Sequence, residues 1–500
     1  MDFISNIVSG FSVALNPLNL GLALVGCLIG TLVGVLPGIG PVTTIALLLP
    51  VTFYLDPTSG LIMLAGIYYG AAYGGSTAAI LLNIPGENSA VMTCIDGHQM
   101  AKQNRAGPAL AIAAIGSLFA GSVATFFIAL FAPPLANVGL AFGAPEYFSL
   151  LLLGLMSVVI LARGSIPKAL AMAVVGLLLG TVGMGTGTER FTFDSVELMD
   201  GIGFVPVAIG IFGLSEIIAN LIAPAENRVV VSSKIGSLWP TRDDWRRSWP
   251  AILRGTGIGS ALGILPGGGV SISTFAAYAV EKKVAKDSSR FGKGAIEGVA
   301  GPESANNAAA QTSFIPMLTL GIPGGAVMAV MIGGLMIHGI QPGPRVMIER
   351  PDLFWGLIAS MWVGNLMLLV INLPLIGIWI QLLKVPYRYL YLAILTFACL
   401  GVYTLNNSVF EVGMAAFFGA VGYACLRLGC ELPPLMLGLV LGPLMEENLR
   451  RAMRISGGDP RIFIDRPISL ALLVVTVALF VVLLLPRVRK TKDRLALDDA

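Results

Sequence analysis

The chain has 500 residues, of which 56% are hydrophobic and 12% are charged, and this charged fraction is about half the usual value for a soluble protein. Its 31 Lys and Arg residues nearly balance its 28 Asp and Glu residues, for a net charge of +3, so no strongly basic surface for nucleic acid is indicated. The composition excludes a soluble enzyme of ordinary type and predicts that lipid surrounds most of the chain.

Long apolar runs follow one another along the chain. A helix crosses a bilayer in roughly 20 apolar residues; several runs are shorter than this and one or two are long enough for a hairpin. We therefore predict an all-α polytopic membrane protein with about 12 transmembrane segments, some of them broken or re-entrant. The runs cover residues 18–36, 41–54, 60–83, 109–132, 146–162, 167–186, 202–223, 251–265, 270–280, 312–340, 354–382, 388–404, 409–426, 433–445 and 467–486.

Polar stretches divide this pattern into domains. The expected domains are a first membrane repeat over 1–225, a basic connecting segment over 226–250, a second membrane repeat over 251–446, a polar loop over 447–466, a final transmembrane helix over 467–486 and a basic tail over 487–500. Since Lys and Arg are enriched in cytoplasmic loops, the connecting segment and the C-terminal tail are both predicted to be cytoplasmic.

The two membrane halves share two motifs, which indicates an internal duplication. Residues 26–40, GCLIGTLVGVLPGIG, align with residues 255–269, GTGIGSALGILPGGG, with eight identities in 15 positions. A second match follows in the same order, with NIPG at 83–86 and GIPG at 321–324.

The loops after the first motif suggest how the halves are oriented. Residues 54–60 include no Lys or Arg, whereas the corresponding loop of the second half carries five between 282 and 293. This contrast favours inverted halves. Parallel halves stay open as an alternative, because inversion would place the arginines of residues 450–466 outside.

The first motif is expected to interrupt a helix. Gly26, Gly30 and Gly34 form a small face that lets another backbone approach closely, and the Pro and Gly residues of 37–41 cannot continue the helix. Freed backbone groups cost several kcal/mol each in hydrocarbon unless something binds them. Paired interrupted helices in two repeats are how many secondary transporters build a midplane site. The alternative is a packing kink without a ligand.

An anionic ligand at these breaks would need more positive charge than the motifs supply. Neither Pro-Gly core contains Lys or Arg, and each helix N-terminus contributes about half a positive charge. We expect a co-bound cation to supply the rest, as a proton or as Na⁺ at backbone carbonyls near Pro37, Pro85, Pro266 and Pro323. No other cofactor is expected. Glu303 is predicted either to face a cavity or to lie in a loop.

Enzymatic signatures are absent from the sequence. There is no GxxxxGK[ST] phosphate loop, no HExxH motif and no recognisable nucleophile–base pair, so the chain is predicted to be a secondary active transporter subunit and not an enzyme.

The duplicated LPGIGP and LPGGG segments and the stretches YYGAAYGGSTAAILLNIPG and SANNAAAQTSFIPMLTLGIPG resemble the large membrane subunit of the tripartite tricarboxylate transporters, the TctA family. The likeness covers nearly the whole chain. It implies a bacterial inner-membrane transporter that imports a tri- or dicarboxylate such as citrate, driven by a cation. It also implies two partners, a small TctB-like membrane subunit and a periplasmic TctC-like solute-binding protein.

The resemblance also implies that the substrate is bound around both pairs of motifs. The candidate residues are Gly38, Gly40, Thr43, Thr44, Ser76, Thr77, Asn83, Gly267, Gly269, Ser271, Ser273, Asn306, Asn307 and Gly324. For each hydroxyl or amide, the alternative role is to satisfy backbone groups at a kink. Two other functions stay open for the chain, an organic-anion channel or exporter without a binding protein, and a structural membrane subunit that does not transport.

Overall fold

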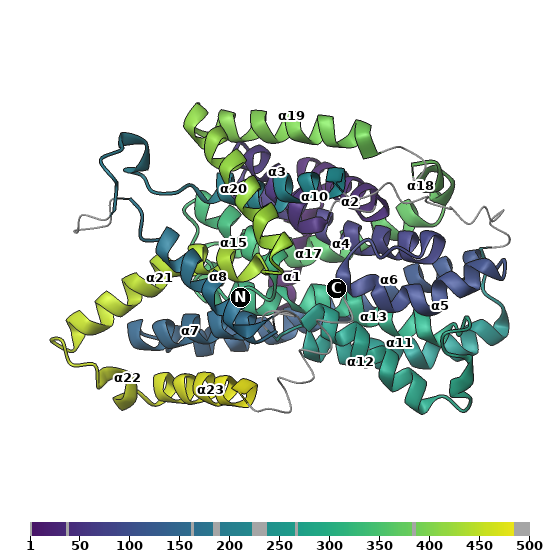
Figure 1. The fold of residues 1–500 in the computed structure, drawn as a ribbon. Helices are drawn as coiled ribbons and strands as arrows, with labels where there is room; N and C mark the ends of the chain where they lie inside the picture. The colour runs from purple at the N-terminus through teal and green to yellow at the C-terminus, as the bar shows by residue number, and fades with distance from the viewer. Residues whose placement is uncertain are drawn as a thin grey trace.

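The computed structural model describes residues 3–36, 40–161, 165–183, 191–222, 238–265, 269–382 and 387–484. Over these ranges the chain is helical (Figure 1), and the only β pairing in them is an isolated bridge between Val182 and Phe191. The prediction of an all-α fold is confirmed.

Long apolar helices alternate along the chain with short helical segments that connect them. In the first half they are α1 (Phe3–Ala14), α2 (Pro17–Val35), α3 (Pro41–Phe53), α4 (Pro57–Leu82), η1 (Asn88–Ala90), α5 (Val91–Lys102), α6 (Ala106–Leu140), α7 (Ala144–Leu161), α8 (Ile166–Leu179), η2 (Val196–Leu198), α9 (Phe204–Ala208), η3 (Ile209–Leu214) and α10 (Ser215–Ile222). In the second half they are α11 (Arg242–Leu262), α12 (Gly269–Val284), η4 (Ser288–Arg290), α13 (Glu297–Thr312), α14 (Phe314–Leu320), α15 (Ala326–Ile337), α16 (Val346–Glu349), α17 (Pro351–Asn372), α18 (Ile376–Leu382), α19 (Tyr387–Asn406), α20 (Val409–Arg427), α21 (Pro433–Ile455), α22 (Ile462–Asp465) and α23 (Pro467–Leu484).

Several helices are suited to a bilayer by length and composition. Those long and apolar enough to cross are Pro17–Val35, Ala106–Leu135, Phe204–Ile222, Pro351–Asn372 and Val409–Arg427. Further apolar helices are shorter. The chain is therefore a multi-pass membrane protein, while the number of about 12 crossings stays a prediction.

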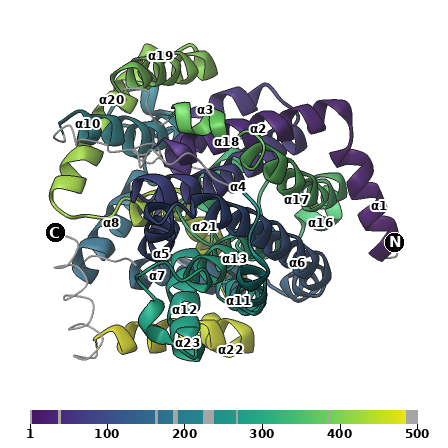
Figure 2. The same cartoon turned by 90° about the vertical axis from the view of Figure 1, so that its right-hand side faces the viewer.

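Helices α4 and α13 form the centre of the molecule. Every residue of α4 from Ser59 to Leu82 is buried, and so is every residue of α13. Figures 1 and 2 show this pair between α2 and α3 on one side and α11 and α12 on the other. Because α13 is buried on all sides yet carries Glu, Asn, Gln, Ser and Thr, its polar groups must find partners inside the protein.

Glycines bring the outer helices onto the central ones, backbone against backbone. A Cβ on Gly30 of α2 would collide with the Ile67 carbonyl of α4, and a Cβ on Gly259 of α11 would collide with the Ala305 carbonyl of α13. The glycines one turn before and one turn after Gly30 and Gly259 are equally close to their neighbours. The close backbone approach predicted from the glycine spacing is confirmed.

The second motif has the same local form in both halves. Helix α4 ends at Asn83, which has a left-handed backbone with φ of 60°, and α14 ends at Gly321, with φ of 71°. Gly86 then packs on Gly75, and Gly324 packs on Ser313. These matching contacts agree with an internal duplication, while the relative orientation of the halves stays a prediction.

Two expected domain boundaries differ from the structure. Helix α21 continues through residue 446 into the segment predicted as a polar loop, because Glu446 pairs with Arg450 and Glu447 with Arg451, one turn apart. Helix α11 begins at Arg242, inside the predicted connecting segment, where Thr241 and Asp244 form a capping box. Residues 226–237 and the tail 487–500 lie outside the described residues.

Candidate functional site

A carboxyl group lies at the contact between the two halves. Glu303 of α13 is 1% exposed, and it forms hydrogen bonds with the hydroxyl groups of Ser76 on α4 and Thr93 on α5. Among the described residues, no Lys, Arg or His forms an ion pair with Glu303. Glu303 lies within helix α13 and not in a loop, while a cavity position for it stays a prediction.

A second acidic residue lies close by, just after the second motif of the first half. Glu87 accepts hydrogen bonds from the Asn306 amide at 3.1 Å and from the Ser89 hydroxyl at 2.5 Å. The hydrogen bond from Asn306 to Glu87 is a further contact between the two halves of the chain. Sequence reasoning missed Glu87, although its position directly after Pro85-Gly86 was a usable signal.

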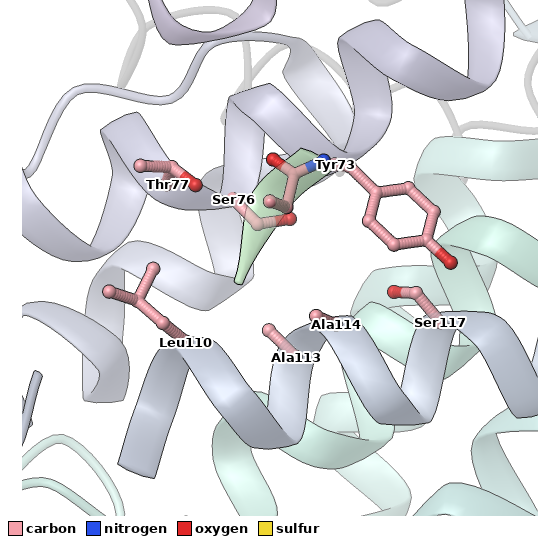
Figure 3. Close-up of a pocket in the computed structure, with 8 residues that line it drawn as sticks. Tyr73, Ser76, Thr77, Leu110, Ala113, Ala114 and Ser117 are labelled. Atoms are coloured by element: carbon pink, nitrogen blue, oxygen red, sulfur yellow. The ribbon is translucent and has the colours of Figure 1, made fainter. Parts of the chain in front are cut away.

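A small cavity adjoins Glu303 through Ser76. Figure 3 shows Tyr73, Ser76 and Thr77 of α4 facing Ala113, Ala114 and Ser117 of α6. The cavity measures about 10 Å³, which is room for one water molecule. Small-molecule sites have volumes of roughly 300–1,000 Å³, so this cavity is too small to hold a carboxylate substrate.

Unpartnered amide groups surround the same region. Asn307 donates to the Ser117 hydroxyl at 2.6 Å and to the Glu303 carbonyl at 3.2 Å, while its Oδ1 has no partner. The Oδ1 atoms of Asn306 and Asn372 and both side-chain polar atoms of Gln311 are also buried without a partner. Such atoms are rare in folded proteins, and here they leave acceptors available to a polar ligand.

An acidic side chain, that of Glu216, lies at the first break, where the substrate anion was expected to bind. Thr43 donates to the Phe212 carbonyl at 2.9 Å and contacts the Glu216 carboxyl group, and the Gly40 N–H points to the same carboxyl group at 3.5 Å. Phe212 lies in η3, a π-helical turn, a form found often at functional sites. Thr44 donates to the Gly40 carbonyl. Glu216 was also missed, since it is distant in sequence.

The described flank of the second break begins at Gly269, and hydroxyl groups in it bond to backbone carbonyls. Ser273 donates to the Val270 carbonyl at 2.6 Å and to the Ala305 carbonyl at 3.3 Å. Gly269 packs on Leu262, and Ser271 is half-buried. The hydroxyl of Ser273 thus performs the alternative role of satisfying backbone groups near a kink.

The remaining candidates divide between helix ends and positions without a description. Asn83 is an exposed cap residue, and Gly324 packs on Ser313. Pro85 comes two residues after the cap residue Asn83, and Pro323 comes two residues after the cap residue Gly321. Gly38, Gly267, Pro37 and Pro266 lie outside the described residues. The structure therefore brings Ser76, Thr77, Asn306 and Asn307 together around Glu303, whereas the described flanks of the two breaks have different neighbours.

A separate charged cavity of about 520 Å³ lies at the start of α11. Arg105 pairs with Asp244 there, and Arg247 pairs with Asp243 at 2.8 Å. Burial acts to raise the pKa of Asp244, but hydrogen bonds from Thr241 and Arg105 outweigh it, so its pKa lies below the ordinary value. The Arg105–Asp244 pair links the start of α11 to the segment between α5 and α6, whereas the Arg247–Asp243 pair lies within α11.

Long apolar helices packed around a buried polar contact define a multi-pass membrane protein. The model of the tripartite tricarboxylate transporter TctA family matches residues 20–437. The chain therefore belongs to the TctA family and is a membrane component of a tricarboxylate transporter.

Two relatives from Agrobacterium vitis are similar to the chain. One, described as "Uncharacterized 52.8 kDa protein in TAR-I ttuC' 3'region", is 56% identical over 501 residues and covers 100% of both chains. The other, "Uncharacterized protein in TAR-II ttuC' 3'region", is 54% identical over 241 residues, which is 48% of this chain and 100% of that protein. No solved structure matches the chain.

Proposed function

We propose that the chain is the large permease subunit of a secondary transporter that imports tri- or dicarboxylates by symport with Na⁺ or H⁺. It works in the bacterial inner membrane with its C-terminus in the cytoplasm. Its partners are a small membrane subunit and a periplasmic binding protein that delivers the substrate. Membership of the TctA family supports the substrate class.

The observation that carries the proposal is the closed polar contact between α4 and α13. Ser76, Thr77 and Asn307 offer hydroxyl and amide groups in and beside a cavity of about 10 Å³. An open channel would keep a continuous aqueous path here, whereas a transporter that alternates between two faces passes through closed states. The closed cavity therefore favours a transporter over a channel.

The acidic groups support coupling to a cation. Glu216 lies at the first break, and Glu303 lies at the contact between the halves. A carboxylate substrate approaching either group would be repelled unless a cation neutralised the charge. Binding of cation and substrate therefore depends on one another, which is the requirement for symport.

The test is uptake of labelled mono-, di- and tricarboxylates into vesicles that contain the chain and its small membrane subunit. We expect citrate or a dicarboxylate such as succinate to accumulate only when the binding protein is present outside. Uptake that is equal with and without the binding protein favours the exporter or channel alternative. No uptake of any acid, with correct folding, favours a structural subunit.

A further inference from the structure

We propose that Glu303 is the proton-binding group of the transporter, so that the coupling cation is a proton carried on this carboxyl group. The inference rests on the proposed function and deepens it, since symport alone leaves the cation open. Three observations carry it: the hydrogen bonds around Glu303, its burial without a cationic partner, and its connection to the small cavity.

The hydrogen bonds around Glu303 suit a protonated carboxyl group, which can donate to Ser76 while Ser76 donates to the Ala72 carbonyl. The Ser76 hydroxyl is within hydrogen-bond distance of both the Ala72 carbonyl, at 3.1 Å, and Oε2 of Glu303. A hydroxyl has one proton to donate. If Ser76 donates to Ala72, as is common one turn back in a helix, the proton between Ser76 and Glu303 comes from the carboxyl group. Thr93 donates to the other oxygen, Oε1.

Among the described residues, none pairs a positive charge with Glu303 that would hold it ionised. It is 1% exposed, and Ser76 and Thr93 are 4% and 1% exposed. Both partners are neutral hydroxyl groups. A buried carboxylate without a cationic partner or a metal is strongly disfavoured, and such a group binds a proton instead.

The titratable groups facing Glu303 are themselves neutral or acidic. Glu87, before η1, adds negative charge that favours protonation, and Tyr73 of α4 and Cys94 of α5 are neutral side chains nearby. The described part of α6 contributes none. The charged groups farther from Glu303 are already engaged: Glu297 of α13 pairs with Arg290, and on the neighbouring helices Glu281 of α12 pairs with Arg254. Asp96 of α5 accepts from Tyr278 and from backbone N–H groups.

Ser76 gives the carboxyl group a connection to the cavity. The same side chain contacts Glu303 and lines the cavity together with Tyr73, Ser117 and Asn372. The Oδ1 atom of Asn372 is buried there without a partner. In the transport cycle, an O–H bond forms on Glu303 as a proton leaves water on the outer face, and it breaks as the proton passes to water inside. The proton on Glu303 thus moves in the same cycle as the substrate.

The first test does not depend on transport. Infrared difference spectra of the full-length chain in lipid, recorded in H₂O and D₂O, report the C=O stretch of protonated carboxyl groups. We expect a band at neutral pH that is lost in Glu303→Gln, shifted in Glu303→Asp and unchanged in Glu349→Gln, which removes an exposed carboxyl group. A spectrum that Glu303→Gln leaves unchanged overturns the proposal.

The second test separates substrate movement from coupling. The carboxamide of Glu303→Gln is neutral and makes the same hydrogen bonds as a protonated carboxyl group. We expect exchange of internal for external citrate or succinate to continue, while accumulation driven by a pH gradient falls by an order of magnitude or more. Unchanged pH-driven accumulation in this variant, or wild-type uptake driven by Na⁺ alone, would show that Glu303 does not carry the ion. Wild-type vesicles that take up no acid at all would refute the proposed function, and the infrared band would still decide the state of Glu303.

Discussion

At the scale of single residues, most polar groups predicted to bind substrate have internal partners. The hydroxyl of Thr43 is engaged by Phe212 and Glu216, and that of Ser273 by two backbone carbonyls. Thr77 differs, because it lines the cavity and its hydroxyl forms no hydrogen bond within the described residues. It is therefore the residue at which a binding role and a packing role are easiest to separate.

Replacing Thr77 with valine tests that role, because the change removes the hydroxyl and keeps the shape. We expect a loss of about 0.5–1.5 kcal/mol in substrate binding, measured as a severalfold higher KM for uptake with unchanged thermal stability. Thr125→Val is the matched control, since the Thr125 hydroxyl only donates to the Gly121 carbonyl one turn back. Equal KM values for the two variants would assign Thr77 to packing.

Asp244 provides a prediction about pH. Its pKa is lower in the folded protein than in the unfolded chain, so its stabilising contribution is complete above about pH 5 and is lost as the pH falls through its titration range. We expect Asp244→Asn to lower stability by about 1–2 kcal/mol at pH 7, seen as a lower midpoint of thermal unfolding in detergent.

The difference between Asp244→Asn and the wild type should shrink on acidification. The control is Asp243→Asn, because the Asp243 side chain is 61% exposed and exposed ion pairs contribute little. A difference that is constant between neutral and acidic pH would contradict the assigned direction of the shift.

At the scale of helices, two pairs define the architecture, α2 on α4 and α11 on α13. The packing role of the glycines on α2 and α11 could be predicted from the sequence, because four-residue spacing alone places them on one face of a helix. Which helix each glycine face packs against could not be predicted, since α4 and α13 are buried on all sides and their sequences show no amphipathic period. The contact of Ser76 with Glu303 was beyond sequence reasoning for the same reason, because it joins residues 227 positions apart.

Alanine substitutions of glycine distinguish contact positions from free ones on the same helix. Gly30→Ala should destabilise the protein by about 1–3 kcal/mol or more, because the new methyl group meets the Ile67 carbonyl and backbone cannot move aside. Gly21→Ala, with nothing within 4 Å of its new Cβ, should be neutral or stabilise by about 0.5–1 kcal/mol.

The same contrast applies in the second half to Gly259→Ala and Gly257→Ala, since the Cβ position of Gly257 is also free. Thermal midpoints in detergent measure all four variants. Equal midpoints within either pair would mean that the close helix contact is absent in the membrane.

At the scale of the whole molecule, the account depends on two related halves that meet at α4 and α13. The family could be predicted from the sequence, because its motifs survive in the chain itself, whereas the two related halves stay a prediction. Glu303 was predicted either to face a cavity or to lie in a loop, but the contacts of Glu87 with Asn306 and of Glu216 with Thr43 were not predicted. Glu87, Glu216 and Glu303 lie within or beside apolar runs, and only folding shows which of them are buried.

Inverted halves predict opposite sides for corresponding loops. In a chain without its native cysteines, single cysteines introduced at Asp56 and Lys286, both exposed, should react with a membrane-impermeant maleimide from opposite faces of sealed vesicles. Lys286 should be on the cytoplasmic face with the basic tail. Labelling of both positions from one face would establish parallel halves.

The most direct measurement is the concentration of labelled carboxylate inside vesicles that contain the wild-type chain and both partners, with Na⁺ and pH gradients imposed separately. The account predicts that the solute rises above its outside concentration when the pH gradient is present, and does not rise with the Na⁺ gradient alone or with no gradient. Solute that merely equilibrates, at the same rate whatever gradient is applied, would contradict it.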